Sequence, residues 1–379
     1  MNVAIRVDAS CRIGTGHVMR CLTLAEMLRA NGAAVSFICR EHPGHLCDLI
    51  EQKGHYCHRL PCAKPGIDTA NDEYSTWLAV SVEEDTRQTQ AFLQRQQCDM
   101  AWLIVDHYVL DERWEKAMRP YAEHIMVIDD LADRRHDCDL LLDQNLYEDL
   151  HTRYDGLLPE NCQKLLGPQY ALLRREFVTA REKMPQRNGT VNCILVFFGG
   201  ADATNETIKA LEAIRLLGRP DIAVDVVVGS SNLHKGQIET AARNMPNVTL
   251  HHQAENMAEL MVRADLAIGG GGTTTWERCY LGLPTITIIV AENQRETIEA
   301  VAARGAVWNM GWYADVFVDT VGRHLKYVLD SPEAVRATGQ AAREVMGDRN
   351  DDVQNPVAAA LLEMTGVVRQ VLHNQNVRR

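Results

Sequence analysis

The sequence predicts an α/β protein built from two Rossmann-like domains, each a parallel sheet with helices on both faces. The chain has 379 residues, a length that suits two domains better than one. Short apolar runs of strand length alternate with helical stretches through both halves of the chain. A polar segment with proline and glycine, 181–190, separates the two halves and has the composition of a linker.

In the first half the alternation begins at once. An apolar run over 2–9 predicts a strand, 10–16 a turn and 16–32 a helix whose apolar residues recur at helical spacing. Asn31 and Gly32 end that helix, and 34–39 is the next strand, which completes one strand–helix–strand unit. The remaining elements expected here are strands at 102–106 and 125–129, helices near 83–95 and 112–118, and a short apolar piece at 140–145.

The second half repeats the pattern more clearly. Strands are expected at 193–198, 224–228, 248–251, 266–268 and 285–290, and helical patterns such as 205–218 and 256–264 lie between them. We therefore expect an N-terminal domain over 1–180, a C-terminal domain over 190–345 and a helical tail over 346–379. Ligands bind at the carboxyl ends of strands in such sheets, so a cleft between the two facing domains is the expected site.

Composition limits the classes of partner. Apolar residues make up 46% and charged residues 24%, and no apolar run reaches the length of a membrane span. The formal net charge of −12 argues against nucleic acid or an anionic membrane as partner. The start lacks the pattern of a secretory signal, and the eleven cysteines include no CxxC pair. We expect a cytoplasmic protein with reduced thiols and no membrane partner. Despite the His/Cys tract 55–62, we expect it to bind no metal and no cofactor.

The first loop whose residues could take part in catalysis or binding follows the first strand. In 10–17, two glycines permit a tight turn, although Met19 replaces the last glycine of a dinucleotide fingerprint. Arg6 and Asp8 share one strand face, and His17 and Arg20 share one helix face. The positive end of the helix dipole disfavours the imidazolium, so His17 is expected to be neutral and able to accept a proton. The alternative is an ordinary turn with a surface histidine.

The second loop is 269–277, which holds four glycines and three threonines between a strand and a helix. Its backbone amides and hydroxyls predict an anion site that suits a diphosphate. No lysine stands where a Walker loop needs one, which argues against a nucleoside triphosphatase. Glu277 could accept both hydroxyls of a ribose, or could simply favour the positive end of its helix.

Further polar residues end other strands. The loop 198–202 could approach a phosphate or sugar, and the amides of Asn293 and Gln294 suit sugar hydroxyls or acetamido groups. In the first half, 106–108 and 129–130 also end strands, and we expect hydrogen-bonding roles for their carboxylates rather than a metal site. Each of these loops is as well explained by an ordinary polar turn.

Several motifs together resemble one family. They are DASCRIGTGHVMRC, VDHY, VIDDLADRRHDCD, GPQYALLRREF, FFGGAD and GGGGTTTWERCYLGLPTI. They are similar to the UDP-2,4-diacetamido-2,4,6-trideoxy-β-L-altropyranose hydrolases of pseudaminic acid biosynthesis, over most of residues 1–310. The second half also resembles the GT-B enzyme that adds N-acetylglucosamine to lipid I. The resemblance implies a GT-B fold and a metal-free hydrolase that releases UDP by water attack at the anomeric carbon, with inversion. No motif is recognised beyond 345.

The resemblance and the loops together predict the site. The family's base corresponds to His17, and we infer that Asp8 orients it; UDP is expected on the glycine-rich loop. The UDP-binding residues expected are Gly271, Gly272, Thr273, Thr274, Glu277 and Met257, and the sugar-binding residues are Arg6, Gly14, Arg20, Tyr108, Asn293 and Gln294. A monomer serving the glycosylation of flagellin or a surface glycan is expected. The rivals are a GT-B glycosyltransferase, a UDP-sugar 2-epimerase and a non-catalytic UDP-sugar sensor.

Overall fold

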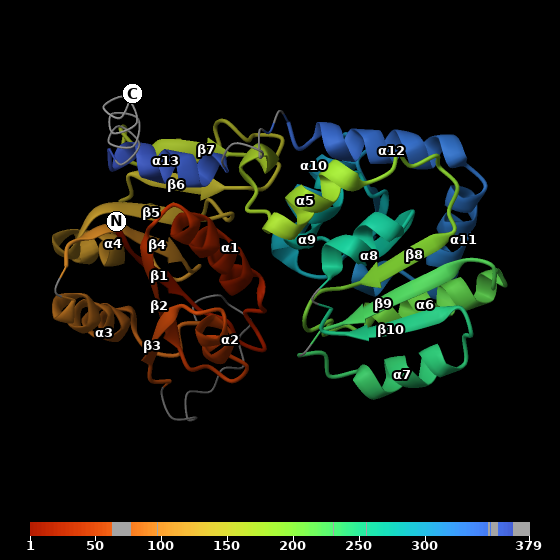
Figure 1. Ribbon diagram of the computed structural model, residues 1–379, viewed down its shortest axis with the longest axis horizontal. Helices are drawn as coiled ribbons and strands as arrows, with labels where there is room; N and C mark the ends of the chain where they lie inside the picture. The colour runs from red at the N-terminus through yellow and green to blue at the C-terminus, as the bar shows by residue number, and fades with distance from the viewer. Residues whose placement is uncertain are drawn as a thin grey trace, which may run out of the picture. The chain divides into compact units, whose positions relative to one another are not determined.

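The computed structural model describes residues 1–62, 77–96, 98–229, 231–254, 256–347, 349 and 355–366 (Figure 1). The chain divides into two compact units. Unit 1 comprises Met1–Gln144, Asp149–Leu172 and the described part of 350–379, and unit 2 comprises Asn145–Glu148 and Leu173–Arg349. Of the expected tail, 346–379, residues 348, 350–354 and 367–379 lie outside the described residues.

Unit 1 is built on a seven-stranded sheet with the order β3-β2-β1-β4-β5-β6-β7, and every pairing in it is parallel. Its strands are β1 (Asn2–Val7), β2 (Ala34–Arg40), β3 (Tyr56–Leu60), β4 (Met100–Asp106), β5 (Ala122–Ile128), β6 (Leu140–Asp143) and β7 (Gln163–Leu166). Its helices are α1 (Gly16–Ala30), α2 (Cys47–Gln52), α3 (Val82–Arg95), α4 (Glu112–Met118) and α13 (Pro356–Met364), with short 3-10 turns η2 (Arg119–Tyr121) and η3 (Pro168–Tyr170).

Strand alternation divides the core of unit 1 between the two faces of this sheet. Val3, Ile5 and Val7 of β1 pack with α1 and α13 on one face. Ala4 packs with α3 and α4 on the other face. Since successive side chains point to opposite faces, Arg6 lies on the side of Ala4, away from α1. This distribution decides which polar residues meet at the end of β1.

Unit 2 is built on a six-stranded sheet with the order β10-β9-β8-β11-β12-β13, again parallel throughout. Its strands are β8 (Cys193–Phe197), β9 (Ala223–Val228), β10 (Val248–His252), β11 (Leu266–Gly270), β12 (Thr285–Ile289) and β13 (Trp308–Trp312). Its helices are α5 (Arg175–Lys183), α6 (Glu206–Leu217), α7 (Lys235–Arg243), α8 (Met257–Arg263), α9 (Thr274–Tyr280), α10 (Arg295–Ala303), α11 (Val318–Leu329) and α12 (Pro332–Glu344), with η4 (Glu292–Gln294) and η5 (Tyr313–Asp315). The predicted α/β class with two parallel sheets is confirmed. None of the helices in the described ranges combines the length and apolar character needed to cross a membrane.

The elements that the sequence analysis missed are short or polar. β3 (YCHRL) and β7 (QKLL) mix polar or charged residues with few apolar ones, and β13 has the pattern WNMGW with a shift of register against β12. They lie at or next to the edges of their sheets, where one neighbour supplies most of the strand's pairing. Edge strands do not need the continuous apolar runs that mark buried parallel strands.

The helix α13 returns to unit 1 after the chain has passed through unit 2, and Figure 1 shows it in blue beside β6 and β7. Val357 and Leu361 are fully buried within the same core cluster as α1. The indole Nε1 of Trp102 on β4 donates a hydrogen bond to the carbonyl oxygen of Leu361 at 3.1 Å. The core of unit 1 is therefore completed by residues that follow the whole of unit 2.

We predict that Leu361→Ala lowers the free energy of unfolding of unit 1 by about 2–5 kcal/mol, because it leaves a cavity between α13 and the sheet. Chemical denaturation followed by tryptophan fluorescence measures this, since Trp102 lies at the contact. The matched control is Leu233→Ala, whose side chain is 89% exposed and whose removal should change little. An unchanged midpoint for Leu361→Ala would contradict the assignment of α13 to the core.

Candidate active site

The loop from β1 to α1 is a tight turn, held by hydrogen bonds to the side chain and the backbone of Ser10. The hydroxyl of Ser10 accepts hydrogen bonds from the amides of Arg12 and Ile13, and the amide of Gly14 donates to the carbonyl of Ser10 at 2.9 Å. Gly14 has φ +79°, a left-handed conformation that glycine adopts without strain. The turn places His17 in the first turn of α1, as the sequence predicts.

His17 is held by a carboxylate from the neighbouring strand. Its Nδ1 lies 2.6 Å from Oδ1 of Asp106, the last residue of β4. Arg20, one turn further along α1, forms two hydrogen bonds with the same carboxylate, from Nε to Oδ2 at 2.6 Å and from Nη2 to Oδ1 at 2.7 Å. Burial alone would raise the pKa of Asp106, but Arg20 and His17 hold that pKa well below its usual range. Asp106 is therefore ionised at neutral pH.

A second carboxylate extends this arrangement. Asp130, which follows β5, accepts a hydrogen bond from the hydroxyl of Tyr108 at 2.6 Å and one from Nη1 of Arg20 at 3.2 Å. The ring of Tyr108 stands edge-on to that of His17, with centroids 4.8 Å apart. The structure thus brings Arg20 and Tyr108 together with His17, but both polar groups are engaged with carboxylates. The guanidinium of Arg20, which the sequence analysis assigned to sugar binding, binds Asp106 and Asp130 in this structure.

Two further expectations for unit 1 are wrong, because Arg6 and Asp8 form a buried pair away from His17. The guanidinium of Arg6 is fully buried and donates to Asp8 at 2.7 and 2.9 Å and to Asp85 at 2.6 and 3.3 Å. Asp8 also accepts from the amide of Arg40 at 2.7 Å. Asp8 therefore does not orient His17, and Arg6 is not placed to bind sugar. The physical reason is strand alternation, which directs Arg6 to the face opposite α1.

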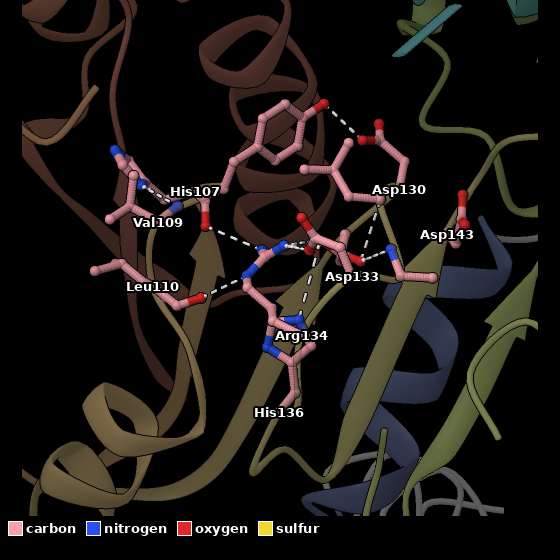
Figure 2. A network of polar contacts seen from close by, with 12 residues as sticks. His107, Val109, Leu110, Asp130, Asp133, Arg134, His136 and Asp143 are labelled. Atoms are coloured by element: carbon pink, nitrogen blue, oxygen red, sulfur yellow. Dashed lines mark hydrogen bonds and ion pairs between the residues drawn. The ribbon is translucent and has the colours of Figure 1, made fainter. Parts of the chain in front are cut away.

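The loops after β4 and β5 are tied together by a polar network (Figure 2). Arg134 donates from Nε to the carbonyl of Leu110 at 2.9 Å and from Nη2 to the carbonyl of His107 at 3.3 Å. Its Nη1 forms an ion pair with Asp129 at 2.9 Å. Asp129 also accepts from the amide of Ala132 at 2.9 Å. The carboxylates after β5 thus take part in hydrogen bonding that fixes the loops carrying Tyr108 and Asp130.

Metal-ligating groups do not converge in the parts of the chain that the structure describes. No group of three or more His, Cys, Asp or Glu side chains there has a geometry that could hold a metal ion. All eleven cysteines are free thiols, of which Cys11 and Cys98 are exposed.

In unit 2 the glycine-rich loop connects β11 to α9. A Cβ on Gly271 would lie 2.5 Å from Cγ1 of Ile298, so this position requires glycine. The amide of Gly271 donates to Oε1 of Gln294 at 3.2 Å, which corrects the expectation that it is available to a ligand. Among the described residues, the backbone amides of Gly272, Thr273 and Thr274 have no protein acceptor. Three consecutive amide donors therefore remain for an anion.

Gln294, in η4, supports this loop through its side-chain oxygen. Oε1 accepts from the amides of both Gly271 and Val290 at 3.2 Å. A side-chain amide whose oxygen accepts two backbone donors directs its NH2 group the other way, and that group lies near Gly272. Gln294 thus lies beside the glycine loop, and Asn293 precedes it in η4.

Glu277 lies one turn into α9 with only 13% of its side chain exposed. Its Oε1 accepts a hydrogen bond from Nε of Arg174 at 3.1 Å and forms an ion pair with Nη2 of the same residue at 3.0 Å. Burial raises the pKa of Glu277, and Arg174 partly offsets that rise. In the described chain, Oε2 has no hydrogen-bond donor, so one carboxylate oxygen remains for a ligand. The sequence analysis missed Arg174, because no pattern links residues about a hundred positions apart.

Two further residues of unit 2 that the sequence analysis singled out, Met257 and Asp202, lie outside the glycine-rich loop. Met257 is the first residue of α8 and is 4% exposed. Asp202, in the loop after β8, accepts from the amides of Glu206 and Thr207 at 2.8 and 3.1 Å. Asp202 therefore caps the start of α6, and its carboxylate oxygens are engaged in that role.

Comparison with known proteins adds to this geometry. Residues 193–342 match the model of the glycosyltransferase family 28 C-terminal domain. A UDP-2,4-diacetamido-2,4,6-trideoxy-beta-L-altropyranose hydrolase of Campylobacter jejuni is 27% identical over 307 residues, which are 80% of this chain and 97% of that protein. The spore coat polysaccharide biosynthesis protein SpsG of Bacillus subtilis is 30% identical over 44% of this chain and 48% of its own length. The chain is a homologue of the Campylobacter hydrolase.

One further relative is longer than this chain, and two solved structures share its fold. The chain spans 57% of the length of the uncharacterized protein MJ1062 of Methanocaldococcus jannaschii, with 25% identity. MurG of Acinetobacter baumannii superposes with a TM-score of 0.57 at 14% identity, covering 91% of this chain and 98% of that one. The spinosyn rhamnosyltransferase SpnG superposes with a TM-score of 0.63 at 16% identity, covering 97% and 100%. The predicted GT-B fold and the resemblance to the hydrolase are confirmed.

We predict that Asp106→Ala lowers the unfolding free energy of unit 1 by about 3–5 kcal/mol at pH 7, because Arg20 loses its main partner while buried. A carboxyl whose folded pKa is depressed stabilises the fold above its unfolded pKa, and that contribution is lost as pH falls through the folded pKa. The difference in unfolding free energy between Asp106→Ala and the unaltered protein should therefore begin to narrow at about pH 4, where the unfolded carboxyl takes up a proton, and should narrow further as the pH falls. Denaturant titrations at several pH values measure it.

The matched control for Asp106→Ala is Glu84→Ala, which removes an exposed ion pair with Arg87 in the same unit. Surface pairs contribute little, so its midpoint should stay near that of the unaltered protein at every pH. Equal effects of the two substitutions would show that Asp106 is not a buried ionic centre.

Proposed function

We propose that this protein is a hydrolase that releases UDP from UDP-2,4-diacetamido-2,4,6-trideoxy-β-L-altropyranose during the synthesis of pseudaminic acid. The observation that carries the proposal is the His17–Asp106 pair at the start of α1, in a homologue of a hydrolase of that name. The family 28 domain in unit 2 supports a nucleotide-sugar substrate. Water attacks the anomeric carbon, the bond from that carbon to the UDP oxygen breaks, and the configuration inverts.

His17 is the proposed general base. An ionised Asp106 next to Nδ1 favours the tautomer with the proton on Nδ1, which leaves Nε2 able to accept a proton. As water attacks, its proton passes to Nε2, and Asp106 stabilises the imidazolium that forms. UDP leaves with the electron pair of the broken bond and needs little protonation, because its phosphates carry the charge. Asp106 and Arg20 act through His17 and are positioning residues.

Unit 2 supplies the proposed UDP site. The free amides of Gly272, Thr273 and Thr274 suit the diphosphate, since backbone donors of this kind stabilise departing negative charge. The free oxygen of Glu277 suits the ribose hydroxyls, and we keep Met257 as a candidate contact to the nucleoside. For the sugar we keep Gly14, Asn293, Gln294 and, through its ring, Tyr108.

A GT-B glycosyltransferase is the second candidate, favoured by the matching family 28 domain and by structural neighbours that are glycosyltransferases. The two candidates use the same donor and differ in whether water or an alcohol attacks. The test is incubation of the purified protein with the UDP-sugar in water enriched in oxygen-18, with no acceptor present. The hydrolase releases UDP and free sugar in equal amounts, and carries the label into the sugar's anomeric hydroxyl.

Other results of that incubation would refute the proposal. Release of UDP only after an alcohol acceptor is added would make the protein a transferase. Label found in UDP rather than in the sugar would place the cleavage at phosphorus. Proton magnetic resonance of the first sugar formed reports whether the anomeric configuration has inverted.

We predict that His17→Asn lowers turnover by about two to four orders of magnitude while UDP binding is retained, the range for removal of a general base. Asp106→Asn should lower turnover too, because the amide no longer enforces the tautomer of His17. The matched control is His151→Asn, an exposed histidine of the same unit, which should keep full turnover. Retention of more than half of the turnover by His17→Asn would exclude His17 as the base.

We predict that Glu277→Ala weakens UDP binding by about 1.5–3 kcal/mol, as expected for hydrogen bonds to a charged group. Calorimetry with UDP and with 2′,3′-dideoxy-UDP measures this, since only the unaltered protein should distinguish the two nucleotides. The matched control is Glu176→Ala, which removes the other carboxylate on Arg174, 2.5 Å from its Nη1. If both variants bind UDP as tightly as the unaltered protein does, the role of Glu277 is limited to its ion pair with Arg174.

A further inference from the structure

A buried guanidinium lies directly behind the glycine-rich loop of unit 2. Arg278 on α9 is 2% exposed. Its Nη2 donates to the carbonyl of Gly270 at 2.6 Å and to the hydroxyl of Thr275 at 3.1 Å, while its Nε has no acceptor in the described chain. No described carboxylate lies within ion-pair distance of it, because the neighbouring Glu277 pairs with Arg174. Arg278 therefore has no ion-pair partner among the described residues.

Three buried arginines of unit 1, by contrast, have ion-pair partners. Arg6, Arg20 and Arg40 each form ion pairs with buried aspartates at 2.6–2.7 Å. Burial without such a partner lowers the pKa of Arg278 to about 10. An unpaired buried charge costs stability, and an apolar side chain of similar length would avoid that cost. A residue that costs stability in this way calls for a functional explanation.

The guanidinium is connected to the loop through the backbone. A Cβ on Gly269 would lie 2.3 Å from Nη1 of Arg278, so glycine at this position is what admits the side chain. Nη2 binds the carbonyl of Gly270, and the N–H of the same peptide unit, that of Gly271, donates to Gln294. The charge thus polarises and orients the first peptide of the loop whose next three amides lack protein acceptors.

We propose that Arg278 is the buried counter-charge of the nucleoside diphosphate, a positioning residue that attracts the anion from behind the loop without touching it. This inference rests on the proposed binding of UDP to that loop. Charge interactions are strong in a region from which water is excluded, so a cation there favours a ligand carrying two or more negative charges. It should do nothing for an uncharged nucleoside on the same surface.

The experiment compares the affinities of UDP and uridine by calorimetry in four variants. Arg278→Met removes the charge, Arg278→Gln removes it but keeps hydrogen-bonding capacity, and Arg278→Lys keeps the charge. Arg187→Met is the matched control: desolvation lowers the pKa of Arg187 to about 10 as well, but Arg187 is only partly buried and donates to the carbonyls of Met261, Ala264 and Leu281.

We expect Arg278→Met and Arg278→Gln to lower UDP affinity by about tenfold or more while uridine affinity stays the same. Arg278→Lys should retain most of the UDP affinity, and Arg187→Met should keep the unaltered ratio of the two affinities. Without ligand, Arg278→Met should unfold at the same temperature as the unaltered protein or higher. If Arg278→Met does not fold, Arg278→Gln gives the same comparison.

Two outcomes separate the inference from the proposed function. If the unaltered protein does not bind UDP, the proposed function itself fails. If the unaltered protein binds UDP, but the neutral variants keep that affinity or lose UDP and uridine affinity equally, then Arg278 only supports packing and the inference is overturned.

Discussion

Asp106 carries a negative charge in a buried position, and a buried charge needs partners. The contacts that supply these partners also position His17, the candidate base of unit 1. The two oxygens of Asp106 receive the guanidinium of Arg20 and Nδ1 of His17. Arg20 in turn reaches Asp130, which receives the hydroxyl of Tyr108. Two carboxylates, a guanidinium, an imidazole and a phenol thus form one connected group, and its geometry fixes the ring of His17 rather than leaving it to a mobile loop.

The fold class and the main loops could be predicted from the sequence, because parallel strands and their helices leave strong periodic patterns. The identity of the carboxylate beside His17 could not. Asp8 is nine residues from His17 in the chain and was the natural candidate, whereas Asp106 is 89 residues away. The choice depends on two facts that one sequence does not encode in any local pattern. β4 lies next to β1 in the sheet, and Arg6 and Asp8 are engaged with each other away from α1.

The same limit applies in unit 2. The glycines and threonines of 269–275 predict a loop with free amides, and three such amides are found. The pattern does not reveal that Gln294 occupies the amide of Gly271, that Arg174 holds Glu277, or that Arg278 fills the space behind Gly269. These are contacts between segments that meet only after the sheet has formed. Arg278 also differs from the buried arginines of unit 1: Arg6 and Arg20 pair with aspartates, whereas Arg278 donates to a carbonyl and a hydroxyl oxygen.

The place of α13 in the core of unit 1 has a consequence for biosynthesis. During translation the strands of unit 1 leave the ribosome first, but the residues that cover one face of their sheet are made only after all of unit 2. The nascent half-protein therefore leaves apolar surface around Trp102 uncovered until Leu361 has been added, because the two residues of the finished contact are 259 positions apart. Unit 2 has a core of its own, which it can complete in that interval. A premature stop codon ahead of α13 would accordingly yield a chain prone to capture by chaperones, even with every residue of both candidate sites present.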